Sequence, residues 1–177
     1  MTYRYDYPHP ALAADIALLT AREGRLSVLL VRRGNSPFES CWALPGGFME
    51  IDETLLDCAA RELEEETGVA GIGLSPVAVF DAVHRDPRER IVTEVHVGVV
   101  RADAVRPRGG SDARAARWFY LSELPELAFD HARIIDKVRL WLRQHRDLLG
   151  LALDMLPSDF EKDDLVRLYA EMSGQNR

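Results

Sequence analysis

The sequence has few cysteines and no long apolar segment. Two cysteines among 177 residues are too few for a disulfide-stabilised scaffold. Cys58 falls in an expected helix and Cys41 lies next to Trp42, so we expect both to be buried free thiols. No apolar run approaches the roughly 18 residues of a membrane span, and the polar N-terminus MTYRYDYPHP carries no signal-peptide core. We therefore expect a cytoplasmic chain with no membrane partner.

The sequence also lacks an excess of positive charge. Its formal net charge is -7, from 22 Lys and Arg against 29 Asp and Glu. An acidic chain has no general attraction for nucleic-acid backbones, so a nucleic-acid partner is not expected. The 47% of hydrophobic and 29% of charged residues are ordinary values that exclude a disordered chain. The length suits one compact domain with a sizeable core.

Segments typical of strands and helices alternate along the chain. The alternation predicts an α/β or α+β class with a mixed sheet. The apolar runs and turn residues predict strands over residues 11–19, 26–31, 77–83, 91–100 and 116–121, with a short strand in CWALPGGF. Periodicity predicts helices over residues 54–67, 129–145 and 162–172.

Two of these helices begin at residues that favour capping. Thr54 and Asp57 have the spacing of a capping box, and Gly68 is placed to end the same helix. Asp130 and His131 open the second long helix and are expected to cap its N-terminus.

The first helix carries four glutamates, Glu62, Glu64, Glu65 and Glu66, in five positions. At 100° per residue, three of them, all but Glu64, share one face. Like charges one turn apart oppose helix formation, and a divalent cation would offset that repulsion. Carboxylate oxygens favour Mg²⁺ or Mn²⁺ over Zn²⁺, and Mg²⁺ often bridges protein to phosphates. The alternative is a solvated acidic helix face with no ligand.

The spacing around the glutamates favours the metal. The chain resembles the Nudix hydrolases at every defined position of their signature box, which here reads Gly47, five residues, Glu53, seven residues, then Arg61-Glu62-Leu63-x-Glu65-Glu66-x-Gly68-Val69. The resemblance implies an α/β/α sandwich with a mixed sheet between the two long helices.

The same resemblance implies residue roles. Glu62, Glu65 and Glu66 would hold Mg²⁺ or Mn²⁺ together with the carbonyl of Gly46. Arg61, with Glu53, would orient the acidic side chains and screen their repulsion.

The implied reaction is hydrolysis of a nucleoside diphosphate linked to another group. A general base must take a proton from the attacking water. Its position stays open between Glu65 and Glu66 in the box, Asp112 on a later glycine-rich loop, and Glu94 on a strand.

Beyond the box, most of the chain resembles one branch of the superfamily, the ADP-ribose pyrophosphatases and the Nudix-related transcriptional regulators. The resemblance is carried by stretches such as YPHPALAADIAL and HRDPRERIVTEVHVGVV. It implies ADP-ribose as substrate, with AMP and ribose 5-phosphate as products. An ADP-ribose-sensing regulator, and a pyrophosphatase acting on nucleoside triphosphates or nucleotide sugars, are the alternatives.

Four arginines could contact phosphates or a ribose: Arg32 and Arg33 at a strand exit, and Arg85 and Arg88 in the RDPR loop. Each alone is also typical of a protein surface. A homodimer is expected, because the N-terminal segment is placed to reach another subunit and homodimers are the commonest oligomers.

We expect a Nudix domain over residues 1–150 and a helical tail over residues 151–177. The tail resembles the start of the winged-helix domain of the regulator branch, and its recognition helix and wing would lie beyond Arg177. Because acidic residues outnumber basic ones in the tail, it makes a poor phosphate-binding face. We expect it to pack on the Nudix domain or on a dimer partner, and a truncated chain stays open.

Overall fold

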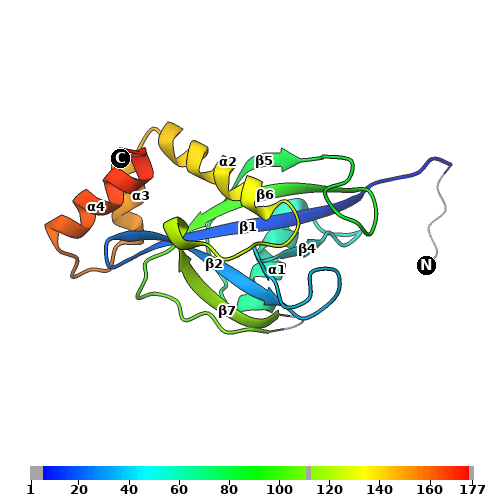
Figure 1. Cartoon of the computed structure of the whole chain (residues 1–177), viewed down its shortest axis with the longest axis horizontal. Coiled ribbons are helices and arrows are strands. Elements are labelled where there is room, and N and C mark those ends of the chain that lie inside the picture. Colours follow the sequence, from blue (N-terminus) through cyan, green and yellow to red (C-terminus); the bar gives the residue numbers. More distant parts are fainter. Residues whose placement is uncertain (1–5, 111–112, 176–177) are drawn as a thin grey trace.

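The computed structural model describes residues 6–110 and 113–175. Within them, strands form one mixed sheet of order β3-β2-β1-β6-β5, with β4 beside β1 and β7 beside β2 (Figure 1). The strands are β1 (Ala11–Arg22), β2 (Arg25–Arg33), β3 (Trp42–Ala43), β4 (Gly46–Phe48), β5 (Leu74–Phe80), β6 (Ile91–Val99) and β7 (Ala113–Tyr120). The helices are α1 (Leu55–Thr67), α2 (His131–Gln144), α3 (Leu148–Met155) and α4 (Lys162–Ser173), with a short 3₁₀ helix at Leu121–Glu123.

The centre of the sheet is β1, which runs parallel to β6 and turns back into antiparallel β2. Its side chains alternate between two cores. Ile16 and Leu18 pack on the α1 side, whereas Ala17 and Leu19 pack on the α2 side. By the same alternation Asp15, a charged residue in this apolar strand, points to the α2 side.

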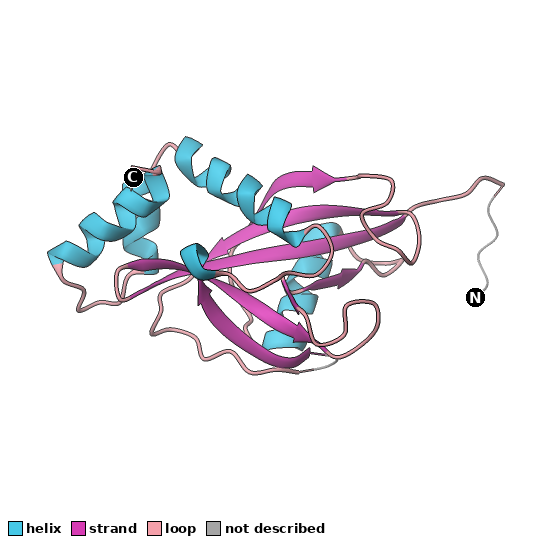
Figure 2. Cartoon of the chain, viewed as in Figure 1, coloured by secondary structure: helices cyan, strands magenta, loops and turns pink. Residues whose placement is uncertain are grey.

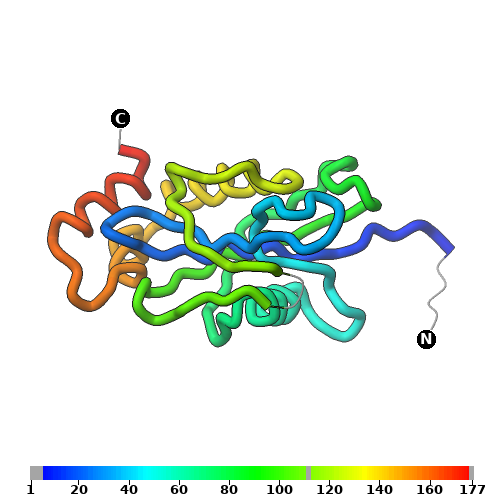
Figure 3. Tube along the Cα trace, turned by 60° about the horizontal axis from the view of Figure 1, so that its bottom comes forward, coloured from blue at the N-terminus to red at the C-terminus, as the bar shows by residue number. Residues whose placement is uncertain are grey.

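The helices cover the two faces of the sheet. Figures 1 and 3 show α1 against one face and α2 against the other. The core under α1 contains Cys58 and Leu63, and the core under α2 contains Ile134 and Val138. The expected α/β/α sandwich with a mixed sheet is therefore confirmed.

The predicted helix and strand bounds hold in most places. The capping box of Thr54 and Asp57 is present, and Gly68 ends α1 in the left-handed conformation. The strand expected over residues 77–83 lies at residues 74–80, because β5 pairs with β6 from Leu74 onward. Cys58 is buried as predicted, whereas Cys41 is half-buried, and both thiols are free.

The start of α2 differs from the prediction. Phe129 has a φ of 53°, so it lies outside the helix, which begins at His131. Asp130 makes no capping hydrogen bond, and its carboxylate instead binds Arg85. Asp130 is thus the N-cap residue by position, as predicted, but its side chain does not cap the helix because a tertiary ion pair takes the carboxylate.

The C-terminal helices gather at the end of the sheet opposite the N-terminus (Figure 2). The sequence prediction missed α3, whose N-cap Asp147 accepts a hydrogen bond from the Gly150 amide. Leu168 and Met172 of α4 belong to the same core as the sheet. The Glu171 carboxylate accepts a hydrogen bond from the Leu26 amide at 2.8 Å. These helices are thus packed into the domain rather than appended to it.

Among the described residues, no helix is long and apolar enough to cross a membrane.

Truncation of Leu168 should destabilise the whole domain, because its side chain is fully buried in the main core. We expect Leu168→Ala to lower the free energy of unfolding by about 2–5 kcal/mol in a single denaturant transition. Val166→Ala is the control, since Val166 is 58% exposed and its loss should change stability by about 0.5 kcal/mol or less. A Leu168→Ala variant as stable as the wild type would show that α4 is not part of the folded core.

Candidate active site

The two glycines of β4 bring the backbone of this strand against both β1 and α1. A Cβ atom on Gly46 would lie 2.3 Å from the Ala14 carbonyl oxygen, and one on Gly47 would lie 2.3 Å from Glu62 Oε1. At Gly46 the clash is with backbone, so no side chain fits there, whereas at Gly47 the Glu62 carboxylate would have to move. The glycines therefore allow the acidic face of α1 to lie directly over β4.

Arg61 is the centre of the acidic face. Its guanidinium donates to both carboxylate oxygens of Glu53, at 3.0 and 2.6 Å. One of its nitrogens, Nη1, donates to Glu62 at 2.8 Å and to Glu65 at 3.3 Å, and Nη2 also donates to the Phe48 carbonyl at 3.1 Å. One cation thus holds three carboxylates and the end of β4, as the sequence predicts for a residue that orients the acids.

These contacts shift the titration of the groups involved. The Arg61 hydrogen bonds lower the pKa of Glu53 to about 2 and raise the pKa of Arg61 itself. Burial raises the pKa of the neighbouring Cys58 thiol to about 12, so it is protonated at neutral pH. Glu53 and Arg61 are therefore a permanent ion pair under physiological conditions.

The remaining glutamates divide as the helical geometry predicts. Glu66 is 8% exposed, and its Oε2 accepts a hydrogen bond from the Gly46 amide at 3.0 Å. Glu62, Glu65 and Glu66 line one cleft, together with Arg33 and other residues, whereas the exposed Glu64 does not line it.

Carboxylates at the edge of a cleft are suitable ligands for a hard divalent cation. In the described part of the chain, however, no group of three or more His, Cys, Asp or Glu side chains is arranged so that it could hold a metal ion. Arg61 lies between Glu62 and Glu65 instead. The donor set fits Mg²⁺ or Mn²⁺ chemically, and binding would require the carboxylates to turn from Arg61 toward the ion.

The loop before β7 binds the end of α1. The amides of Arg108 and Gly110 donate to the carbonyls of Thr67 and Glu66, at 2.9 and 3.1 Å. A Cβ atom on Gly110 would lie 2.5 Å from the Glu65 carbonyl oxygen, so glycine is needed for this contact.

Asp112, the loop candidate for the general base, lies outside the described residues, and its role stays a prediction. The strand candidate, Glu94, lies 3.2 Å from the buried ring of His96.

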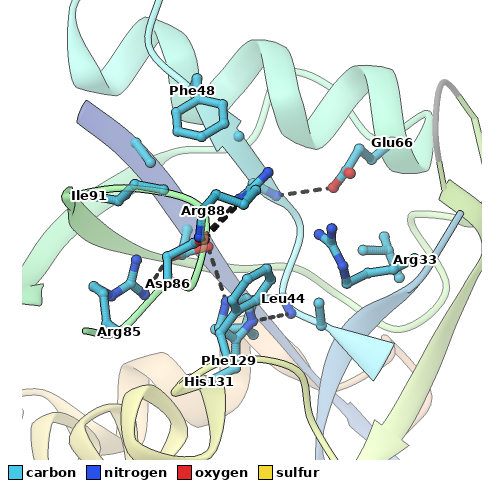
Figure 4. A pocket seen from close by; sticks show the side chains of 16 residues that line it. Arg33, Leu44, Phe48, Glu66, Arg85, Asp86, Arg88, Ile91, Phe129 and His131 are labelled. Atoms are coloured by element: carbon cyan, nitrogen blue, oxygen red, sulfur yellow. Dashed lines mark hydrogen bonds and ion pairs between the residues drawn. The ribbon is translucent and has the colours of Figure 1, made fainter. Parts of the chain in front are cut away.

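A second cavity adjoins the acidic cleft, and several residues line both. Figure 4 shows Phe48 on one side of it, Phe129 and His131 on the other, and the side chains of Arg33 and Glu66 at one end. Residues that line both spaces are Arg33, Gly46, Gly47, Phe48, Glu66 and Arg88. The two spaces therefore form one elongated site with an acidic half and a mixed half.

The four predicted arginines occupy different positions. Arg33 and Arg88 line the site, where the Arg33 guanidinium lies 4.8 Å from the Phe129 ring centre and that of Arg88 lies 5.0 Å from the Phe48 ring centre. Arg88 also donates to both oxygens of Asp86, at 3.0 and 2.8 Å.

The other two arginines are less available to a ligand. Arg85 also lines the second cavity, but its side chain is 5% exposed and binds both oxygens of Asp130, at 3.1 and 2.6 Å. Arg32 is exposed and donates to the Ser40 carbonyl at 3.1 Å. Substrate contact by any of the four stays a prediction.

Sequence reasoning missed Asp15, Phe129 and His131, which also line the second cavity. The His131 Nδ1 accepts a hydrogen bond from the Leu44 amide at 2.9 Å, so the proton of the neutral ring lies on Nε2. Burial lowers the pKa of His131, and the ring is uncharged at neutral pH. The sequence feature that could have indicated these residues is Asp15 itself, a carboxylate in the middle of an apolar strand.

Comparison with known proteins agrees with this geometry. The NUDIX domain family matches residues 9–138, which is most of the chain. The chain belongs to the Nudix family.

Two curated Nudix relatives cover much of its length. An ADP-ribose pyrophosphatase from Methanocaldococcus jannaschii is 39% identical over 76% of this chain and 76% of its own length. The ADPR responsive transcriptional repressor NtrR from Acinetobacter baylyi is 31% identical over 97% of this chain and 70% of its own length.

Solved Nudix structures share the fold. The NUDIX domain of Shewanella oneidensis NrtR, complexed with ADP ribose, matches with a TM-score of 0.71 and 31% identity over 78% of this chain and 94% of that chain. A bifunctional NMN adenylyltransferase/ADP ribose pyrophosphatase from Francisella tularensis, complexed with AMP and a Mn ion, matches with a TM-score of 0.60 and 27% identity over 77% of this chain and 43% of that chain.

The Glu53–Arg61 pair should make stability depend on pH. The pKa of Glu53 is lowered from 4.5 to about 2 in the folded state, so its contribution is present above pH 4.5 and is lost as the pH falls toward 2. We expect Glu53→Gln to lower the melting temperature at pH 7 by several degrees in EDTA. The difference from wild type should shrink between about pH 4.5 and pH 2. Glu64→Gln, which changes an exposed glutamate of the same helix, should follow the wild-type curve. A difference that does not vary with pH would contradict the assignment.

Proposed function

We propose that this Nudix protein hydrolyses ADP-ribose to AMP and ribose 5-phosphate. The observation that carries the proposal is the acidic cleft around Arg61, which continues into a cavity lined by Arg33 and Arg88. A diphosphate can lie across that junction, with its ends directed into the two halves. The 39% identity to an ADP-ribose pyrophosphatase supports this choice of substrate.

In the proposed reaction, the oxygen of a water molecule forms a bond to one phosphorus, and the bridging P–O bond breaks. Glu62, Glu65 and Glu66, with the carbonyl of Gly46, would hold Mg²⁺ or Mn²⁺, which neutralises phosphate charge and acidifies water when bound. Arg61 keeps the carboxylates on one face. Arg33 and Arg88, which line both halves of the site, supply positive charge for the phosphates.

A general base takes the proton of the attacking water. Glu65, Glu66 and Asp112 are our candidates. A loop residue is supported by the contacts of Arg108 and Gly110, whose amides bind the carbonyls of Thr67 and Glu66 at the end of α1.

An ADP-ribose-responsive regulator is the second candidate function. It is favoured by the similarity to the repressor NtrR, which covers 97% of this chain, compared with 76% for the pyrophosphatase. A regulator would bind ADP-ribose without turning it over. Nucleoside triphosphates and nucleotide sugars are the alternative substrates of an enzyme.

Other properties remain proposals. We propose a homodimer in the cytoplasm, with the Nudix domain over residues 1–150 and the C-terminal helices packed on it. The exposed, extended segment that includes Tyr7, 79% exposed, projects from the body and supports a contact with a second subunit (Figure 1). The absence of a nucleic-acid partner stays a prediction.

The experiment that tests the function is a substrate panel with the purified chain and Mg²⁺ or Mn²⁺. It compares ADP-ribose with ADP-glucose, GDP-mannose, NADH, diadenosine polyphosphates and nucleoside triphosphates, and release of AMP or pyrophosphate is measured. We expect preference for ADP-ribose and loss of turnover in EDTA. Tight binding of ADP-ribose without turnover of any substrate would favour the regulator instead.

Substitution of Glu66 should separate catalysis from folding. Glu66→Gln keeps an acceptor for the Gly46 amide but removes the charge, so we expect turnover to fall about 10³-fold or more with little change in melting temperature. Glu64→Gln is the matched control and should turn over ADP-ribose at the wild-type rate. Near-wild-type turnover by Glu66→Gln would refute the metal-binding role.

A further inference from the structure

Asp15 is a buried carboxylate that the acidic box does not use. It is the sole charged residue between Ala11 and Ala21 of β1, and it is 8% exposed. It lines the second cavity, on the opposite face of the sheet from α1. A buried carboxylate in a central strand is costly unless something compensates its charge.

The partners of Asp15 hold it only at long range. Arg85 Nη2 lies 3.5 Å from one carboxylate oxygen, and His131 Nε2 lies 3.6 Å from the other. Arg85 donates its shorter hydrogen bonds to Asp130, and His131 Nδ1 accepts a hydrogen bond from the Leu44 amide. Among the described residues, no closer donor faces Asp15. A carboxylate can accept about four hydrogen bonds, so that of Asp15 can still accept hydrogen bonds from a ligand.

Two hydrogen-bonded contacts hold the backbone segments around Asp15 in place. Arg85 ties the loop after β5 to the start of α2 through Asp130, and His131 ties α2 to the segment before β4 through Leu44. Phe129, between these anchors, is held at a φ of 53°. A non-glycine residue in that conformation persists when its neighbours determine it, and such residues cluster at ligand sites.

We propose that Asp15 and His131 form a hydroxyl-binding subsite for the terminal sugar of the substrate. The inference rests on the proposed function and names which end of ADP-ribose enters the second cavity. Asp15 would accept hydrogen bonds from sugar hydroxyls, which replace its long contacts with short ones. The Nε2–H of His131 would donate to a sugar oxygen.

The charges in the cavity favour a neutral polyol over a phosphate. Asp86, 6% exposed, is a second buried carboxylate on its wall and is paired with Arg88, while Asp15 lies beside Arg85, so this part of the cavity has no excess of positive charge to bind a phosphate. Phosphates are therefore kept at the junction, beside Arg33 and Arg88. The polar neighbours of the Asp15 carboxylate are Arg85 and His131, while the aromatic rings of Phe48 and Phe129 lie on two sides of the cavity (Figure 4).

Ligand binding by the full chain tests the proposal. Isothermal titration in EDTA, where nothing is hydrolysed, compares ADP-ribose with ADP, which lacks the terminal sugar. We expect Asp15→Asn to weaken ADP-ribose binding about tenfold, the usual cost of losing hydrogen bonds to a charged acceptor, and to change ADP binding less than about twofold. His131→Asn, whose amide oxygen can still accept the Leu44 amide, should show the same selectivity.

The control is Asp103→Asn, which changes an exposed aspartate paired with Arg101 and should bind both ligands like wild type. Equal losses for ADP-ribose and ADP in the Asp15 variant would overturn the proposal, because they indicate a structural role. A larger loss for ADP, or no loss at all, would also overturn it. If the wild type turns over ADP-ribose with Mg²⁺, such results reject the subsite alone; if it neither binds nor hydrolyses ADP-ribose, the proposed function fails as well.

Discussion

The site depends on keeping several like charges together on one helix face. Glu62, Glu65 and Glu66 repel one another, and Arg61 compensates part of this charge because it binds two of them and Glu53. The sheet supplies the rest of the constraint, because the glycines of β4 let the helix approach closely enough for the Gly46 amide to bind Glu66. Without Arg61 the repulsion would act on the helix that carries the box. The acidic face is thus stabilised by the protein before any cation binds.

The same site is extended by contacts from distant parts of the sequence. Residues 108–110 of the loop before β7 bind the last turn of α1, while Asp130 holds Arg85, which lines the second cavity. Both contacts fix backbone segments rather than single side chains. One half of the site thus has a high density of carboxylates, and the other half has buried carboxylates that lie beside arginines.

Much of the fold could be predicted from the sequence. The apolar runs of β1, β2 and β6 are long and clear, and the helix with the capping box was placed within one residue. The prediction missed α3, a short helix whose cap is a single local hydrogen bond, and it placed the start of α2 too early. Periodicity does not show that Phe129 adopts a positive φ, because tertiary contacts impose that conformation. The acidic face could be predicted from the spacing of residues on one helix. The proximity of Asp15 and His131 could not, because the two residues are far apart in the sequence and are brought together by the sheet and the start of α2.

The most direct test of the account is a titration of the chain with Mn²⁺, followed by the electron paramagnetic resonance signal of the free ion. The central claim is that the glutamates around Arg61 turn toward a divalent cation, although Arg61 now lies between two of them. We expect a saturable loss of the free-ion signal. ADP-ribose should make Mn²⁺ bind more tightly, since the diphosphate supplies further oxygen ligands. A free-ion signal that is undiminished with and without ADP-ribose would contradict it.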